Sequence, residues 1–258
     1  MKRLTKLLAA TVVYSCAQSA SATIIADNYI GADDHNWGDR IGNHTTSGGG
    51  YTFEIHNMEV DLVGTMLSVQ INTNYAGHAG LWGTGYGDLF LSNSWNPAGS
   101  ELNNYLIDDN TNGTTWTYGF SLDGNRYDAN NMGGTGTLYK FTTANSSSDN
   151  ANNAVLSDAV TSSTFRNGQE VIVRRDSGDA VSNGSWSISN DDADDYIVFN
   201  IDLANTGLLT GDEIALHWGM TCGNDTIEGA YAVPEPGILA LLGLGAGILG
   251  FTSRRRNS

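Results

Sequence analysis

The chain has 258 residues, with 28 acidic and 12 basic side chains, so its formal charge at pH 7 is −16. Between residues 23 and 233 the balance is steeper, with 27 acidic against six basic residues and a formal charge of −21. This charge excludes nucleic acid and anionic membrane surfaces as partners of the body and suits solubility or cation binding. Glycine, at 32 residues, is well above its usual share of about 7%, which is typical of a turn-rich and strand-rich chain.

The first 22 residues have the organisation of a signal peptide. A basic start precedes a short apolar run over residues 7–13, and the basic residues are Lys2, Arg3 and Lys6. Ala20 and Ala22 then form an A-x-A site for signal peptidase. We therefore predict export of the unfolded chain across the inner membrane, with a mature protein that starts at Thr23.

Short alternating segments over residues 23–230 predict a single β domain. Apolar residues recur at every second position in many of them, and turn residues separate the runs. The predicted strands cover residues 51–55, 60–62, 67–71, 89–91, 116–122, 171–173, 186–188, 196–203 and 214–220. Tight turns are predicted at Asp123-Gly124, Asn167-Gly168 and Asn183-Gly184. This pattern favours an all-β fold, and we expect an antiparallel β-sandwich of the jelly-roll type. Residues 144–155 are a polar loop of low complexity, and residues 151–163 could hold one short helix.

Six tryptophans raise the question of a carbohydrate site, because aromatic faces stack on the apolar faces of sugars. Three of them, Trp116, Trp186 and Trp218, lie in alternating runs and are predicted core residues. Trp82 and Trp95 lie in glycine-rich or polar surroundings instead. They are the better candidates for glycan stacking.

An acidic run before one predicted strand is a candidate metal site. Four carboxylates fall within five residues, namely Asp191, Asp192, Asp194 and Asp195. Calcium prefers six to eight oxygen ligands, although this run lacks the spacing and final glutamate of an EF-hand. The alternative is a solvated acidic turn that discourages pairing between sheet edges. Calcium is the only cofactor that the sequence suggests.

Motifs of enzymes are missing from the sequence. It contains no Gly-x-Ser-x-Gly elbow, no phosphate-binding loop and no zinc-binding helix motif. Removal of the signal peptide leaves a single cysteine, Cys222, which cannot form an internal disulfide. With 27 acids in the body, carboxylate pairs for glycoside hydrolysis cannot be placed from sequence. We predict a protein that is not an enzyme, and a polysaccharide-active enzyme stays as an alternative.

A compact three-part signal lies at the C-terminal side. It starts with the polar motif Val233, Pro234, Glu235 and Pro236. Residues 237–251 then carry no charge and predict one transmembrane helix. Fifteen helical residues rise about 22 Å, which is short for a hydrocarbon core of roughly 30 Å but tolerable. Arg254, Arg255 and Arg256 follow and favour a cytoplasmic end.

This order of motif, apolar span and basic cluster resembles the PEP-CTERM sorting signal of bacterial exosortase substrates, here over residues 231–258. The resemblance implies a Gram-negative bacterium that makes an extracellular polysaccharide. It also implies cleavage near Pro234-Glu235-Pro236 by a membrane-embedded cysteine protease-transpeptidase. The mature protein would be released or attached to the envelope or matrix. Residues 87–91 and 216–229 are similar to stretches in a subset of PEP-CTERM surface proteins, and this likeness bears on location and fold type only.

Taken together, these features predict a non-enzymatic protein of the cell surface or extracellular matrix. Its expected processing partners are signal peptidase and exosortase, with extracellular polysaccharide as a further partner. The alternative is a calcium- or glycan-binding module of the exopolysaccharide matrix.

Overall fold

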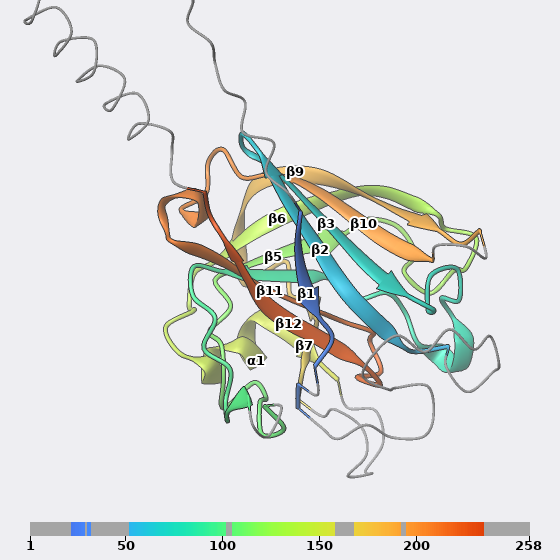
Figure 1. The fold of residues 1–258 in the computed structure, drawn as a ribbon, viewed down its shortest axis with the longest axis horizontal. Coiled ribbons are helices and arrows are strands. Elements are labelled where there is room, and N and C mark those ends of the chain that lie inside the picture. Colours follow the sequence, from blue (N-terminus) through green and yellow to red (C-terminus); the bar gives the residue numbers. More distant parts are fainter. Residues whose placement is uncertain are drawn as a thin grey trace, which may run out of the picture.

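Antiparallel strands make up most of the computed structural model, which describes residues 22–28, 30–31, 52–101, 105–157, 168–191 and 195–234. Ten strands form one sheet (Figure 1). They are β1 (Thr23–Ala26), β2 (Ile55–Val63), β3 (Met66–Thr73), β4 (Leu89–Ser92), β5 (Tyr118–Leu122), β6 (Gly133–Phe141), β9 (Gly178–Ser189), β10 (Tyr196–Asp202), β11 (Glu213–Gly219) and β12 (Thr226–Ala232).

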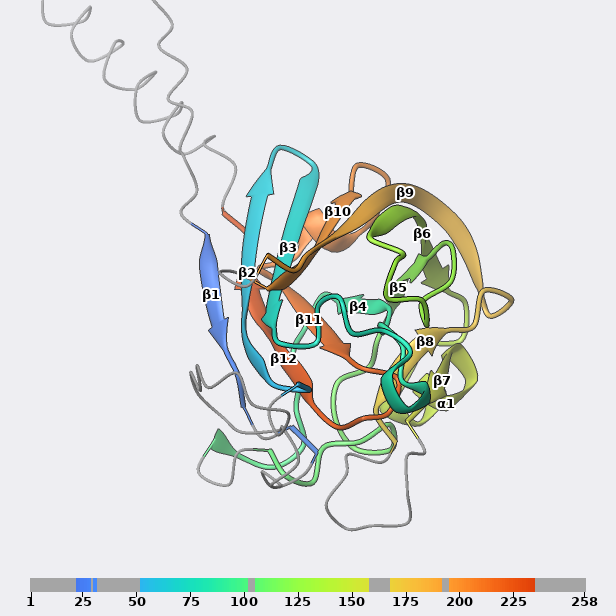
Figure 2. The same cartoon turned by 90° about the vertical axis from the view of Figure 1, so that its right-hand side faces the viewer.

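The sheet curls until its first and last strands meet. Its spatial order is β1-β2-β3-β10-β9-β6-β5-β4-β11-β12, and every neighbouring pair is antiparallel. At the seam, Ile25 of β1 packs against Gly229 of β12, where a Cβ atom would clash with it. The Asn28 side chain also donates a hydrogen bond of 3.3 Å to the Glu228 carbonyl oxygen. The sheet is therefore a nearly closed barrel (Figure 2).

The expected all-β antiparallel class is confirmed, whereas the expected jelly-roll sandwich is not. A sandwich needs two separate sheets, but hydrogen bonding runs through all ten strands here. The 12-residue strand β9 continues the sheet, because it pairs with β10 over residues 184–189 and with β6 over residues 178–187. Curling one sheet on itself covers most of the strand edges that a flat sheet would expose.

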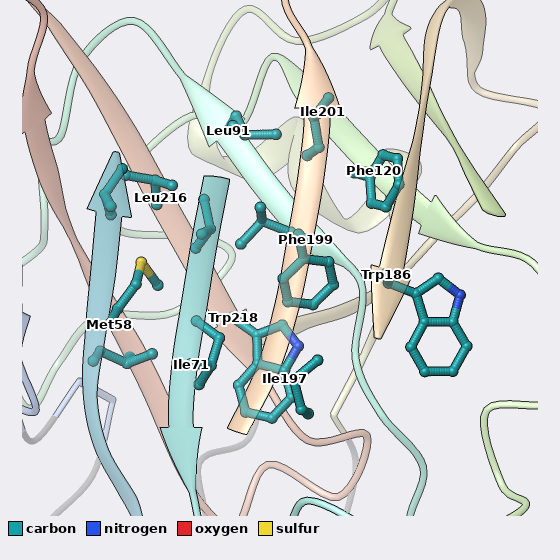
Figure 3. Packing of buried hydrophobic residues seen from close by; sticks show 14 of the residues in the cluster. Met58, Ile71, Leu91, Phe120, Trp186, Ile197, Phe199, Ile201, Leu216 and Trp218 are labelled. Carbon is teal, nitrogen blue, oxygen red and sulfur yellow. The ribbon is translucent and has the colours of Figure 1, made fainter. Parts of the chain in front are cut away.

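The barrel interior holds the main hydrophobic core. Side chains from β2, β3, β10, β5, β4 and β11 converge there (Figure 3). Large aromatic side chains of this core include Phe120, Phe199 and Trp218, together with Trp186 from β9, all at most 2% exposed. The strands predicted at residues 67–71, 89–91, 196–203 and 214–220 are confirmed as β3, β4, β10 and β11. The prediction at residues 51–55 was wrong, since residues 52–53 form a turn and β2 starts at Ile55.

The predicted turn at Asn183-Gly184 was also wrong, because both residues lie inside β9. Gly184 pairs with Gly136 of β6, and a Cβ atom at either position would clash with the Phe120 ring. The two glycines thus make room for a large aromatic ring inside the barrel. An Asn-Gly pair usually favours a hairpin turn, but here packing sets the position of the glycine.

A second layer covers the outer face of β4, β5 and β11. It contains the two-stranded sheet of β7 (Ala154–Leu156) and β8 (Glu170–Val173), the short helix α1 (Asn150–Asn153) and residues 93–101 and 105–116. The described part of the chain also contains the short 3-10 helices η1 (Leu81–Gly83), η3 (Ser147–Asp149) and η4 (Leu208–Thr210). A second hydrophobic cluster, which includes Phe90, Trp116 and Val173, lies between this layer and the barrel. Trp116 is a core residue as predicted, but of this outer core.

The membrane-related predictions fall almost entirely outside the described residues. Of the signal peptide only Ala22 is described, exposed and next to the first residue of β1. The expected transmembrane helix over residues 237–251 is not described at all. Within the described ranges, no helix has the length and apolar character needed to cross a bilayer.

Candidate functional site

The barrel has two different ends. The end where β1 begins and β12 finishes is called the seam end below. The opposite end, called the loop end, carries residues 74–88, 123–132, 190–191, 195 and 220–225. Contacts join these loops: the Thr73 amide donates to the Asp195 carbonyl oxygen at 3.0 Å, and the Gly85 amide donates to Oγ1 of Thr221 at 2.7 Å.

Trp82 lies on the loop end and is open to solvent. Its side chain is 73% exposed, and its backbone φ of 50° lies in the left-handed region, uncommon for a residue with a Cβ atom. The ring stacks on Phe53 at a centroid distance of 5.5 Å, and Phe53 stacks on buried Tyr75 at 5.3 Å. One face of Trp82 is therefore supported from below while much of the ring stays accessible.

A second exposed aromatic belongs to the neighbouring loop. Tyr127 is 44% exposed, and its backbone and ring lie so close to Gly80 and Gly85 that neither glycine has room for a Cβ atom. The loop is fixed to the barrel by Arg126, whose Nη1 donates to the Tyr86 carbonyl oxygen at 3.0 Å and to Asp88 Oδ1 at 2.9 Å. The loop end thus presents two aromatic rings on an ordered base.

The acidic run also belongs to the loop end. Asp191 is exposed, Asp195 precedes β10, and Asp192 and Asp194 lie outside the described residues. In the described part of the chain, no group of three or more His, Cys, Asp or Glu side chains is arranged to hold a metal ion. Calcium binding by this run therefore stays a prediction.

Trp95, the other glycan candidate, lies in the outer layer and is half-buried. Its indole Nε1 donates to Glu228 Oε2 at 3.0 Å, and its backbone amide donates to Glu213 Oε1 at 2.8 Å. Its ring also meets Tyr105 edge-on at 5.3 Å. These contacts tie Trp95 to the barrel wall, so the structure separates the two tryptophans that the sequence grouped together.

Trp95 leads to a buried polar cluster that sequence reasoning missed. We call His217, Glu228, Glu170 and Asp108 the acid–histidine cluster, and each is at most 4% exposed. His217 Nδ1 lies 2.8 Å from Glu228 Oε1, and Nε2 lies 2.7 Å from the Glu170 carbonyl oxygen. Glu170 Oε1 is buried and accepts no hydrogen bond from the described residues.

Burial dominates the electrostatics of this cluster. It raises the pKa of Glu170 and of Glu228 to about 8 each, and it raises the pKa of Asp108 to about 9, with the nearby charge of Glu228 adding to the last shift. Burial also lowers the pKa of His217. These directions favour a largely protonated set of acids around a neutral imidazole at neutral pH.

The hairpin register could have revealed part of this cluster. His217 and Glu228 face each other across β11 and β12, and the turn between these strands spans residues 220–225. Counting residues outward along both strands from that turn places His217 opposite Glu228. The register does not show that this face of β11 is covered, however, and only the outer layer explains their burial.

Cys222 is half-buried beside the loop end, and burial raises the pKa of its thiol. A raised pKa lowers the thiolate fraction at neutral pH, which fits a packing residue rather than a nucleophile.

Comparison with known proteins bears on the C-terminal segment. A family model described as the PEP-CTERM protein-sorting motif matches residues 232–256. The chain carries a PEP-CTERM sorting motif. No curated protein and no solved structure matches the chain.

The PEP-CTERM motif indicates processing by an exosortase, export, and membrane-associated sorting to the cell envelope. Its match begins at Ala232, the last residue of β12. Val233 is partly buried against the core, and its amide donates to the Asp212 carbonyl oxygen at 2.9 Å. Pro234 is exposed, whereas the remaining predicted signal residues, Glu235, Pro236, Arg254, Arg255 and Arg256, lie outside the described residues.

Proposed function

We propose that this protein is a non-enzymatic component of the cell surface or extracellular matrix, delivered by exosortase-dependent sorting. The observation that carries the proposal is the position of the PEP-CTERM motif, which starts where the last barrel strand finishes. Cleavage in that motif would leave all twelve strands intact. The barrel is then the domain that is delivered, and the motif is the sorting signal that is cleaved off.

The burial of the acid–histidine cluster supports a structural role for the most perturbed titratable groups. Catalytic groups with shifted pKa values normally line a cleft that substrate can enter. Here all four side chains are buried, His217 and Glu228 on the barrel strands and Asp108 and Glu170 in the outer layer. Their shifted pKa values therefore follow from packing and need no reaction to explain them.

The proposal is tested by mass spectrometry of the mature C-terminus, on protein taken from the envelope and the medium of its native host. A chain that ends near Val233 to Pro236 is expected, and any added mass would identify covalent attachment. A chain that still contains Arg254 to Arg256 in both fractions would contradict sorting by cleavage. Matrix polysaccharide that is incubated with the purified barrel domain should also gain no reducing ends. New reducing ends would favour the alternative that the protein is a polysaccharide-active enzyme.

A second candidate function is binding of matrix glycans through Trp82. The observation that favours it is the exposed ring, which is stacked on Phe53 and held in a strained turn. Affinity electrophoresis in the host polysaccharide tests this function. Trp82→Ala should abolish retardation without lowering Tm, while Leu81→Ala, which changes an exposed residue in the same turn, should not. Equal retardation of the unchanged protein, Trp82→Ala and Leu81→Ala would show that Trp82 does not bind the polysaccharide.

The calcium alternative needs its own measurement. If the acidic run binds calcium, millimolar Ca²⁺ should raise Tm, and Asp191→Asn with Asp195→Asn should remove that increase. The same pair of substitutions without added calcium is the matched control. If Tm does not change with calcium concentration, the acidic run is a solvated acidic turn and not a calcium site.

A further inference from the structure

The sorting motif leaves the barrel from a fixed point. Ala232 pairs with Glu213 of β11, and the Val233 amide extends the ladder to the Asp212 carbonyl oxygen. Only residues 234–236 separate this point from the apolar run that starts at Gly237. Four residue steps reach at most about 14 Å, at about 3.5 Å each. The seam end must therefore lie close to the membrane during membrane-associated sorting.

The β2–β3 hairpin turns at this same end. Val63 pairs with Met66 across the turn, and β2 runs beside β1. The negative charge of Asp61 on β2 acts on Tyr231 of β12, which places the two strands near each other there. Figure 2 shows the hairpin projecting at the end where β1 begins.

The hairpin tip is apolar and solvent-exposed. Val63 is 70% exposed and Met66 is 45% exposed, and the two residues between them, Gly64 and Thr65, carry no charge. The tip is also held in place, because the Leu203 amide donates to the Thr65 carbonyl oxygen at 2.8 Å. A rigid apolar projection is unexpected on a body of charge −21, and exposed apolar surface of this kind marks contact sites.

We propose that the hairpin tip, residues 63–66, contacts the phospholipid interface and seats the barrel on the membrane while the PEP-CTERM motif is processed. The inference rests on membrane-associated sorting and not on the absence of catalysis. The short tether holds the tip near the bilayer, so even weak insertion of two apolar side chains is favoured by a high effective concentration. The seat aligns Pro234 with a membrane-embedded protease.

Acidic side chains next to the hairpin tip determine which lipid head groups it can contact. Asp202 pairs with Met66 in the β3–β10 register, and a hydrogen bond with Thr65 lowers the pKa of Asp202, so its carboxylate is ionised beside the tip. Asp61 follows on the neighbouring strand. Anionic lipid would repel both groups, and salt would screen the repulsion. The seat should therefore prefer zwitterionic lipid.

The test uses the exported full chain, kept uncleaved in a host without exosortase and reconstituted in phosphatidylcholine–phosphatidylethanolamine vesicles. Cys222→Ser removes the one thiol that the exported chain keeps, and Thr65→Cys carries an environment-sensitive fluorophore. Asn130→Cys, an exposed site on the loop end, is the matched control. Spin-labelled lipid should quench the probe at position 65 at least about threefold more than the probe at 130. Adding Val63→Ser and Met66→Ser should remove the difference, and adding anionic lipid should reduce it.

Three results would overturn the seat. The first is equal quenching at both positions. The second is quenching at position 65 that ignores the two serine substitutions. The third is protection of that probe that follows protein concentration instead of lipid, which would indicate a second copy as the partner. Failure of these tests alongside a correctly cleaved C-terminus in the native host would remove the seat and leave the proposed sorting intact. Each labelled variant is first checked for the same Tm as the Cys222→Ser parent, as expected because positions 63, 65, 66 and 130 are exposed.

Discussion

His217 Nδ1 and Glu228 Oε1 lie 2.8 Å apart in the barrel wall and share a single proton. The other ring nitrogen, Nε2, faces the Glu170 carbonyl oxygen at 2.7 Å, and because a carbonyl only accepts, Nε2 carries a hydrogen. The Nδ1–Oε1 contact then needs one more proton. The raised pKa of Glu228 and the lowered pKa of His217 both place it on Glu228. A neutral Glu228 thus donates to His217 and accepts from Trp95.

This proton count predicts different outcomes for two substitutions. Glu228→Gln keeps one donor for His217 and one acceptor for Trp95, so the free energy of unfolding should change by less than about 1 kcal/mol. Glu228→Ala leaves both partners unsatisfied and opens a cavity, so it should cost about 2–4 kcal/mol. Urea unfolding of both variants measures the difference. Glu101→Gln, at an exposed position, is the control, and a Glu228→Gln variant as unstable as Glu228→Ala would point to an ion pair instead.

Stability should fall as the pH rises from mildly acidic to alkaline. Glu170 and Glu228 keep their protons to about pH 8 when folded, whereas unfolded glutamates lose them near pH 4.3. Between these values the folded state binds more protons, so the free energy of unfolding decreases with pH. His217 has the opposite effect below about pH 6.5, because the unfolded state binds its proton more tightly.

Above about pH 5 the two glutamates outweigh the one histidine, so stability should be highest below about pH 5 and drop by at least about 2 kcal/mol by pH 9. Chemical unfolding across this range provides the measurement. Glu228→Gln should flatten the alkaline decrease, because it removes one of the acids that ionise there. A profile that rises toward pH 9 would show that these acids are ionised in the fold.

The glycine pair around Phe120 gives a packing prediction. Gly136→Ala would push a methyl group into the Phe120 ring and should lower the free energy of unfolding by about 1–3 kcal/mol. Phe120→Leu in the same chain should recover part of the loss by returning space. Gly207→Ala meets only Tyr118 Oη at 3.6 Å and should be tolerated. Additive losses in the double variant would disprove the steric coupling.

The ion pair of Asp88 and Arg126 should contribute far more than the exposed pair of Asp123 and Arg175. Asp88 is fully buried and also accepts from the Leu122 and Val173 amides at 2.9 and 2.7 Å. Burial raises the pKa of Asp88, and the Arg126 guanidinium opposes that rise. Arg126→Met leaves this carboxyl without its cation and should cost about 3–5 kcal/mol.

Asp123→Ala is the matched comparison. Its pair with Arg175 has both side chains more than 40% exposed, so its loss should cost less than about 1 kcal/mol. Thermal unfolding of the two variants at equal ionic strength compares them directly. Equal losses would show that burial adds nothing to the Asp88 pair.

Much of the strand pattern was readable because alternation records which face of a strand is buried. Ile214, Leu216 and Trp218 of β11 were placed in the core correctly for this reason. Alternation could not place His217, in the opposite phase, because it reports one sheet face and says nothing of a second layer above the other. Gly184 was wrongly predicted to lie in a turn. The sequence does not distinguish a glycine that leaves room for a neighbouring group from one that adopts a positive φ in a turn.

The sequence alone determined the sorting signal, because processing enzymes recognise a short linear motif that does not depend on tertiary structure. It also determined the all-β class, since strand periodicity is local too. Only the tertiary structure decided that the strands close into one barrel rather than two stacked sheets, because strand order depends on contacts between distant segments. It likewise separated Trp82 from Trp95 and brought Asp108, Glu170, His217 and Glu228 together. Burial and charge proximity are properties of three-dimensional packing, and no spacing along the chain encodes them.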